Sequence, residues 1–384
     1  MPTTSSIAIL LLGLSSVQEG KPAPAAEHGD GSVAAERSAG LSGLADEAIQ
    51  AIQRFRVPDG FRVELFASEP LLANPVAFCF DVFGRVYVAE TFRHSKGVTD
   101  IRSHMNWLED DIAIKTVADR VAMFRKHEGD DGLASGYSVE TERVSRIIDK
   151  DGDGVADGSV VFSGDLTDPA VGIGAGVLAR PMDGMGGTEL WFTCIPDVWR
   201  MFDSDGDGVA ESRTSQSEGY GLRVALLGHD LHGLTLGPDG RIYFSIGDRG
   251  FNITTAEGQE LIRYGTGAVF RCELDGSGLE IFCDGLRNPQ ELVFDEQGNL
   301  FTLDNNSDGG DQARWTWLLK GSDTGWRQAY QWVGEPTSRG PWNEELLWKP
   351  FSPEQPAYVL PPIANFTSGP SGLTIYPGTG FGEE

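Results

Sequence analysis

The sequence has few of the residues that build common redox and nucleic-acid sites. Its 384 residues include four cysteines, which form neither a CxxC pair nor a CxxCH haem motif, and only six histidines. Basic residues number 30 against 57 acidic ones, giving a formal net charge of −27. A surface this acidic repels phosphate backbones but tolerates divalent cations. We therefore expect no nucleic-acid partner.

Long apolar runs are also missing, so we expect no transmembrane segment. The run 7–14 is too short to cross a bilayer but has the length of a signal-peptide core, although no Lys or Arg precedes it. Small residues at Ala23 and Ala25 suit a cleavage site. We predict a signal peptide over 1–25, a disordered lead-in over 26–50 and export to the periplasm or cell surface.

Glycine is abundant instead, and it punctuates a repeated pattern. An alternating strand, a turn with Asp or Gly and an apolar strand recur at 77–91, 177–195, 233–248 and 291–305, and a fifth copy at 372–380 stops early. A four-stranded propeller blade needs about 40–50 residues. We predict an all-β, six-bladed β-propeller over 51–384, truncated before its last blade closes.

The stretches between these copies are expected to supply outer strands, such as 120–126 (RVAMFRK) and 143–148 (RVSRII). The charged, partly helical interval 92–120 is interpreted as an excursion above one blade. Cys272 and Cys283 flank a turn and could form a disulfide across a hairpin, but free buried thiols are the favoured alternative.

Two acidic loops share one spacing and are candidate calcium sites. Carboxylates fall at loop positions 1, 3, 5 and 9, and glycine occupies position 6, where the chain turns sharply. The glutamate that closes an EF-hand at position 12 is absent. A structural calcium ion and a metal-free Asx turn both remain open. The acidic residues are Asp149, Asp151, Asp153 and Asp157 in the first loop, and Asp203, Asp205, Asp207 and Glu211 in the second.

The candidate active site lies in the stretch 228–250, GHDLHGLTLGPDGRIYFSIGDRG. His229 and His232 precede the hairpin, and Asp248 follows it. In a propeller, the loop before an inner strand lines the central opening, and a histidine held by a carboxylate is a good general base. The alternative is a structural histidine in a turn.

This stretch resembles the soluble quinoprotein glucose dehydrogenase and sorbosone dehydrogenase propellers. In that family a His precedes the hairpin and an Asp nineteen residues later supports it, as His229 and Asp248 do here. The segment GLRNPQEL places Arg287 and Asn288 where the family contacts its quinone cofactor, PQQ. DNNSDGGD (304–311) with KGSDTGW (320–326) is similar to the loop that holds the cofactor's calcium.

Residues 55–384 also resemble the N-terminal domain of the bacterial membrane-bound dehydrogenases, through GFRVELFASEP, LGHDLHGL and PPIANFTSGPSGLTIYPGTG among others. In two respects the chain departs from the quinoproteins. Gly228 stands where they have an Asp before the base, and the cations of their last blade would fall beyond Glu384.

The resemblance implies a quinoprotein-like dehydrogenase that oxidises a sugar or polyol with PQQ and calcium, with a c-type cytochrome as a possible electron acceptor. In it, His229 takes the hydroxyl proton, Asp248 orients His229, and Arg287 with Asn288 holds the cofactor. A calcium-dependent lactonase with Asn288, Asn305 or Asp308 as ligands is one alternative. A non-catalytic glycan- or protein-binding propeller is another, since tryptophans crowd 315–348 and could stack on sugars.

Overall fold

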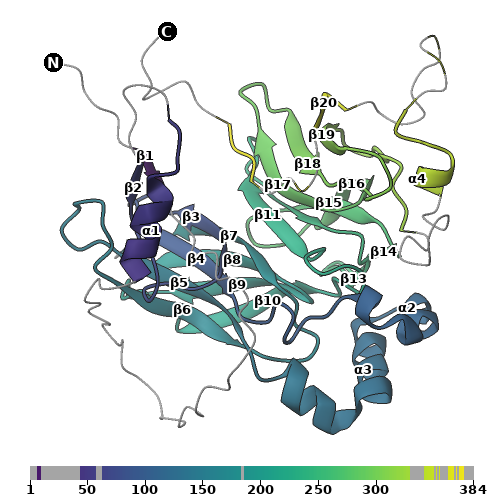
Figure 1. Cartoon of the computed structure of the whole chain (residues 1–384), viewed down its shortest axis with the longest axis horizontal. Helices are drawn as coiled ribbons and strands as arrows, with labels where there is room; N and C mark the ends of the chain where they lie inside the picture. The colour runs from purple at the N-terminus through teal and green to yellow at the C-terminus, as the bar shows by residue number, and fades with distance from the viewer. Residues whose placement is uncertain are drawn as a thin grey trace.

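Four antiparallel sheets of four strands, each sheet nearly continuous in the sequence, form a propeller-like arrangement (Figure 1). The computed structural model describes residues 7–9, 44–57, 63–182, 186–328, 341–349, 352, 354, 362–366, 369 and 372–375. The first sheet, blade 1, contains β3 (Pro75–Phe80), β4 (Val86–Thr91), β5 (Glu142–Ile148) and β6 (Gly158–Leu166). Blade 2 contains β7 (Gly174–Pro181), β8 (Thr188–Cys194), β9 (Asp197–Asp203) and β10 (Ser212–Glu218).

Blades 3 and 4 repeat the order. Blade 3 contains β11 (Leu231–Leu236), β12 (Ile242–Ile246), β15 (Gly267–Cys272) and β16 (Glu280–Leu286). Blade 4 contains β17 (Pro289–Phe294), β18 (Leu300–Asp304), β19 (Ala313–Leu318) and β20 (Ala364–Phe366). The hairpin β13 (Phe251–Thr254) and β14 (Glu260–Arg263) extends from blade 3.

The first strands of successive blades pack side by side, β3 on β7, β7 on β11 and β11 on β17. All four sequence templates therefore form the first hairpin of a blade, as predicted. The second strands are the most deeply buried, because both of their faces meet a neighbouring layer: every residue of β4 and β8 is buried. Aromatic residues fill the space between blades 2 and 3, with Phe270 in contact with Tyr220, Phe244 and Phe251.

The interval between β4 and β5 forms helices that project from one end of the molecule (Figure 1). They are the 3-10 turns η1 (Ile101–Ser103) and η2 (Met105–Trp107), α2 (Leu108–Ala113), α3 (Val117–Gly132) and the π-helical turn η3 (Leu133–Tyr137). The outer strand expected at 120–126 is wrong, because these residues lie in α3. A capping box between Thr116 and Asp119 starts this helix, and Met123 and Phe124 are buried on one of its faces.

The remaining described elements lie near the ends of the chain. They are β1 (Ile7–Ile9), which pairs in parallel with β2 (Val63–Leu65), and the helices α1 (Leu44–Ile52) and α4 (Pro341–Glu344). No helix in the described ranges is long and apolar enough to cross a membrane. The fifth template has no strand over 372–375, and its remainder lies outside the described residues. All four cysteines are free thiols, in agreement with the favoured alternative.

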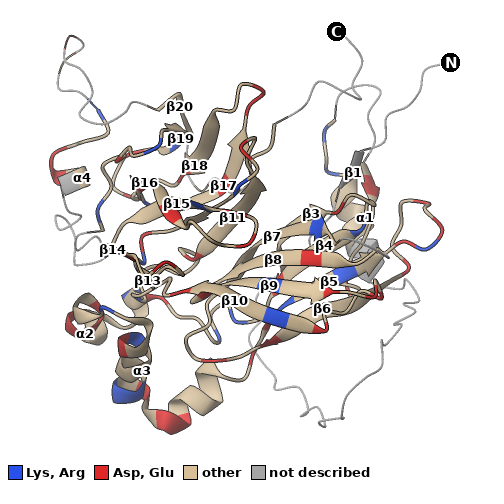
Figure 2. Cartoon of the chain, turned by 180° about the vertical axis from the view of Figure 1, so that it is seen from behind, with Lys and Arg blue, Asp and Glu red and all other residues tan. Residues whose placement is uncertain are grey.

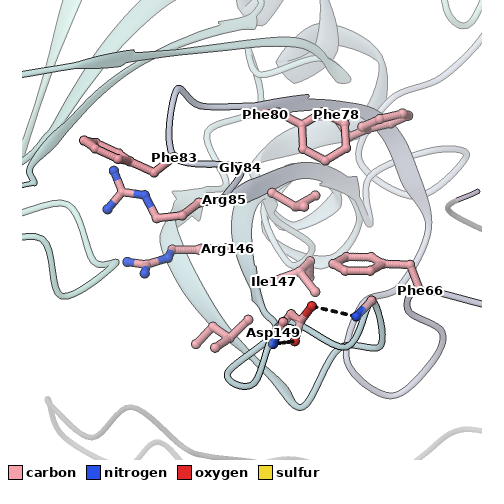
Figure 3. A pocket seen from close by; sticks show the side chains of 13 residues that line it. Phe66, Phe78, Phe80, Phe83, Gly84, Arg85, Arg146, Ile147 and Asp149 are labelled. Carbon is pink, nitrogen blue, oxygen red and sulfur yellow. Dashed lines mark hydrogen bonds between the residues drawn. The ribbon is translucent and has the colours of Figure 1, made fainter. Parts of the chain in front are cut away.

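The first strand of blade 1, β3, has apolar side chains exposed on one face. Along β3, Ala77 and Cys79 pack toward blade 2, whereas Val76, Phe78 and Phe80 point the other way and are 43–60% exposed. Phe78, Phe80 and Phe66 line a pocket of about 470 Å³, with Arg85 and Arg146 side by side at its edge (Figure 3).

Candidate functional site

The candidate site residues meet at one edge of blade 3. His229 precedes β11, Asp248 follows β12, and Arg287 and Asn288 connect β16 to β17. Adjacent antiparallel strands reverse direction, so the start of β11, the end of β12 and the end of β16 share an edge. The pairings Leu231 with Ile246 and Gly267 with Leu286 fix this alignment.

His229 and Asp248 form a buried pair. Nδ1 of His229 lies 2.8 Å from Oδ1 of Asp248, and the two residues are 4% and 0% exposed. The carboxylate accepts the Nδ1 proton, so Nε2 is the ring nitrogen that can accept a further proton. This is the arrangement that general-base chemistry requires.

The structure separates the roles of the two neighbouring histidines. Nε2 of His232 lies 3.0 Å from the carbonyl oxygen of Gly228, to which it donates. Burial lowers the pKa of His232, so the ring stays neutral in this donor role. His232 therefore supports the loop that carries His229.

The carboxylate of Asp304, which the sequence analysis missed, holds the backbone of Arg287 and Asn288. Their backbone amides donate to Asp304, at 3.0 and 2.8 Å, and Asp304 also pairs with Arg314 at 2.5 Å. All four residues are buried. A buried ion pair that also accepts two backbone N–H groups fixes a loop firmly, because any movement would leave a charge unpaired.

The side chains of Arg287 and Asn288 face the same region as His229. The guanidinium of Arg287 lies 5.7 Å from the ring centre of Trp326 and 3.3 Å from the exposed carboxylate of Asp308. Nδ2 of Asn288 donates to the carbonyl oxygen of Gly228, at 3.3 Å. The amide is thus tied to the loop of the histidine, and the cation to Trp326 and Asp308.

Trp326 is a second residue that the sequence analysis missed. Its indole Nε1 donates to Oδ2 of Asp248 at 2.8 Å, and the residue is 1% exposed. The sequence signal was the KGSDTGW string, which we interpreted only as part of a calcium loop. Oδ1 of Asn305, which the sequence suggested as a metal ligand, accepts from the amides of Asn306 and Gly369.

The segment carrying Trp326 approaches blade 3 closely because Gly285 has no side chain. Gly285 has a φ of +81°, and a Cβ there would lie 2.5 Å from the amide nitrogen of Thr324. The amide of Trp326 donates to the carbonyl of Gly285 at 2.8 Å. Because Gly285 has no Cβ, the segment 323–328, here called the tryptophan strap, can pack closely against blade 3.

The segment between β4 and β5 also contacts the edge of the blades where the candidate site lies. Oδ2 of Asp100 accepts from the amide of Leu227 at 3.1 Å, and the amide of Ile101 donates to the carbonyl of Ala225. Acidic residues line the loops of the blades and occur along α2 and α3 (Figure 2). Two hydrogen bonds, one from a carboxylate and one from the backbone, thus connect the segment between β4 and β5 to the loop that precedes His229.

The two acidic loops lie at the opposite edge of their blades. They connect β5 to β6 and β9 to β10, the hairpins that alternate with those at the site edge. Asp203, Asp205, Asp207 and Glu211 bring their oxygens within 4.8 Å of one another, as do Asp149, Asp151 and Asp153 in the first loop. Asp157 is not in that group and accepts from the amide of Lys150.

Both loops use the same internal hydrogen bonds. The first carboxylate accepts from two glycine amides, those of Gly152 and Gly154 in one loop and of Gly206 and Gly208 in the other. Burial is the main cause that raises the pKa of Asp203. A bound cation would oppose this shift, but a metal-free Asx turn forms the same bonds.

The donor set at the site edge is compatible with one end of PQQ. Arg287 offers a guanidinium that is suited to a carboxylate, and Asn288 offers an amide beside the His229–Asp248 pair. Arg249, which follows Asp248, is paired with the buried carboxylate of Asp230. Arg287, whose ion-pair partner Asp308 is exposed, is therefore the candidate cation for the cofactor at this edge.

The sheets and this edge define a propeller-like protein with a buried histidine–carboxylate pair. The chain belongs to the DUF7133 family, described as a domain of unknown function, which matches residues 47–384. No curated protein matches the chain.

Several solved structures are distantly similar. The PQQ-bound aldose sugar dehydrogenase of Streptomyces coelicolor is 16% identical, covering 79% of this chain and 72% of its own, with a TM-score of 0.41. A glucose dehydrogenase-type oxidoreductase of Thermus thermophilus is 14% identical over 80% and 75%, with a TM-score of 0.42. The PQQ domain of Coprinopsis cinerea pyranose dehydrogenase is 13% identical over 68% and 51%, with a TM-score of 0.37. These likenesses are too distant to transfer a substrate or a cofactor.

Proposed function

We propose that this chain is a quinoprotein-like dehydrogenase domain that oxidises a sugar or polyol with PQQ and calcium. The observation that carries the proposal is the buried His229–Asp248 pair beside Arg287 and Asn288. The motif resemblance found in the sequence supports it independently of the geometry.

In this proposal Nε2 of His229 accepts the proton of the substrate hydroxyl. Asp248 keeps the ring in the correct tautomer and stabilises the imidazolium that forms. Arg287 and Asn288 would hold the cofactor, and Asp304 keeps their backbone in place. When bound, PQQ supplies a two-electron acceptor for the hydride that leaves the substrate carbon.

Dye-linked turnover tests the proposal. The calcium- and PQQ-loaded protein is offered a panel of aldoses and polyols with an artificial electron acceptor. Substrate-dependent dye reduction that is lost in His229→Ala supports it. Hydrolysis of lactones without PQQ would instead favour the lactonase, and glycan binding that His229→Ala leaves unchanged would favour a binding propeller.

We propose that both acidic loops bind calcium in a structural role. Their oxygens are grouped as a hard cation requires, and they lie at the edge away from His229. Asp203 in the second loop is buried, which makes this loop the better candidate.

Six blades remain a proposal beyond the four described. The exposed apolar face of β3 supports it, because the first strands β7 and β11 pack against a neighbouring blade on both sides. Export and electron transfer to a c-type cytochrome are likewise proposals that rest on the sequence. Reduction of an added cytochrome c by the loaded protein would test the latter.

A further inference from the structure

Both carboxylate oxygens of Asp248 are engaged by side chains from opposite directions. Oδ1 lies 2.8 Å from Nδ1 of His229, and Oδ2 accepts from the indole nitrogen of Trp326, also at 2.8 Å. The carboxylate is completely buried, and the amide of Asp248 donates to the carbonyl of Arg287. Nε2 of Gln328 also lies 3.4 Å from Oδ1. Rotation of the carboxyl group would therefore disturb the hydrogen bonds at both oxygens.

The same indole also contacts the cation expected to hold the cofactor. The guanidinium of Arg287 lies over the ring of Trp326 at 5.7 Å, within the range of a cation–π interaction. A buried Trp normally finds a partner for its N–H group, and here that partner is the carboxylate that also binds His229. One side chain thus links the two halves of the site.

The backbone around Trp326 is fixed to blade 3 at several points. The amides of Thr324, Trp326 and Gln328 donate to the carbonyls of Asp284, Gly285 and Gly265 at 3.0, 2.8 and 2.7 Å. The hydroxyl of Thr266 donates to the carbonyl of Trp326 at 3.0 Å. This strap is therefore positioned by the blade and can in turn position Asp248.

We propose that Trp326 is a positioning residue that locks Asp248 and so holds His229 in the Nδ1–H tautomer. Its contribution to catalysis rests on the proposed function, but its effect on the tautomer does not. With the indole donor present, the carboxylate presents Oδ1 to the ring. Without it, Oδ2 loses this donor, and the longer contact of Gln328 to Oδ1 stays in place. A carboxylate that turns leaves the ring free to protonate at Nε2, which removes the basic lone pair from the site.

Nitrogen NMR of protein labelled with ¹⁵N-histidine reads the tautomer directly, without substrate or cofactor. The test variant is Trp326→Phe, which keeps an aromatic ring near Arg287 and removes the N–H donor together with part of the indole. The matched control is Trp191→Phe. Trp191 is also buried, donates to the carboxylate of Glu189 at 3.0 Å and lies under Arg200, but its carboxylate has no histidine partner among the described residues.

At a pH where the ring is neutral, wild type and Trp191→Phe should show the Nδ1–H form of His229. Trp326→Phe should shift it to a mixture with the Nε2–H form. An unchanged tautomer in folded Trp326→Phe would overturn the inference. If that variant does not fold, Asp248→Asn should move the Trp326 indole proton signal of the otherwise intact protein, and an unmoved signal would overturn the inference as well.

The two proposals can fail separately. A shifted tautomer in a protein that neither binds PQQ nor oxidises sugars would keep the positioning role and remove the dehydrogenase. If turnover is found, Trp326→Phe should lower kcat and leave KM unchanged, because the indole is buried and donates to the carboxylate of Asp248.

Discussion

Oδ1 of Asp248 lies 2.8 Å from Nδ1 of His229, although 19 residues and a complete hairpin separate them. The pairing of Leu231 with Ile246 aligns the two strands and brings their ends together. The distance is therefore set by the register of β11 and β12, and the pair is as rigid as the hairpin that carries it.

Replacing the carboxylate should mainly affect turnover. Asp248→Asn keeps the size of the side chain but removes the charge that stabilises the imidazolium, so we expect kcat for sugar oxidation to fall about 10²–10⁴-fold. Steady-state kinetics would show this with KM nearly unchanged. His232→Gln is the control, and a larger loss in that variant would mean that the wrong histidine has been assigned.

The close approach at Gly285 predicts a stability difference between two glycines. Gly84 has a φ of +78° with no atom within 4 Å of a built Cβ, so Gly84→Ala should cost about 1–2 kcal/mol of unfolding free energy. Gly285→Ala adds a clash with the backbone of Thr324 and should cost about 1–3 kcal/mol more. Denaturant unfolding measures both free energies. Equal losses of unfolding free energy in the two variants would show that the segment 323–328 does not pack tightly against Gly285.

Asp197 predicts a pH dependence of stability. Burial raises its pKa to about 6, while a hydrogen bond from Ser215 opposes the shift and the carboxylates of Glu218 and Asp168 add to it. A raised pKa in the folded state stabilises the fold fully below about pH 4, and this contribution is lost as the pH rises through 6.

The loss should amount to at most about 3 kcal/mol. Asp197→Asn should remove this part of the pH profile, since the amide cannot ionise. Urea unfolding at pH 4.5 and pH 7.5 compares the two proteins, and a profile that the substitution leaves unchanged would show that Asp197 titrates normally.

Calcium should stabilise the fold through the second acidic loop. At a hundred times its dissociation constant, one bound ion contributes about 2.7 kcal/mol, so a chelator should lower the Tm. Asp203→Asn should remove much of that calcium dependence. Asp275→Asn is the control, because Asp275 accepts similar turn hydrogen bonds from Ser277 outside the grouped acids. If the Tm does not depend on calcium, both loops are Asx turns that bind no metal.

The sequence predicted the repeated hairpins because apolar alternation and turn glycines are local signals. It also placed His229, Asp248, Arg287 and Asn288 together through spacing and resemblance. It failed at 120–126, where Met123 and Phe124 fit a strand as well as a helix until the cap at Thr116 and Asp119 is considered. Trp326 and Asp304 were missed because their partners lie far away in the sequence or on the backbone, where no periodic pattern reveals them.

Calorimetric titration of PQQ into the calcium-loaded protein tests the central claim most directly. Arg287→Ala is the test variant, and Arg241→Ala, which removes a partly exposed arginine paired with Glu273, is the control. The account predicts binding at about micromolar affinity in wild type and control, and its loss in Arg287→Ala. No binding heat in folded wild-type protein, or equal binding by Arg287→Ala, would contradict the proposed quinone site.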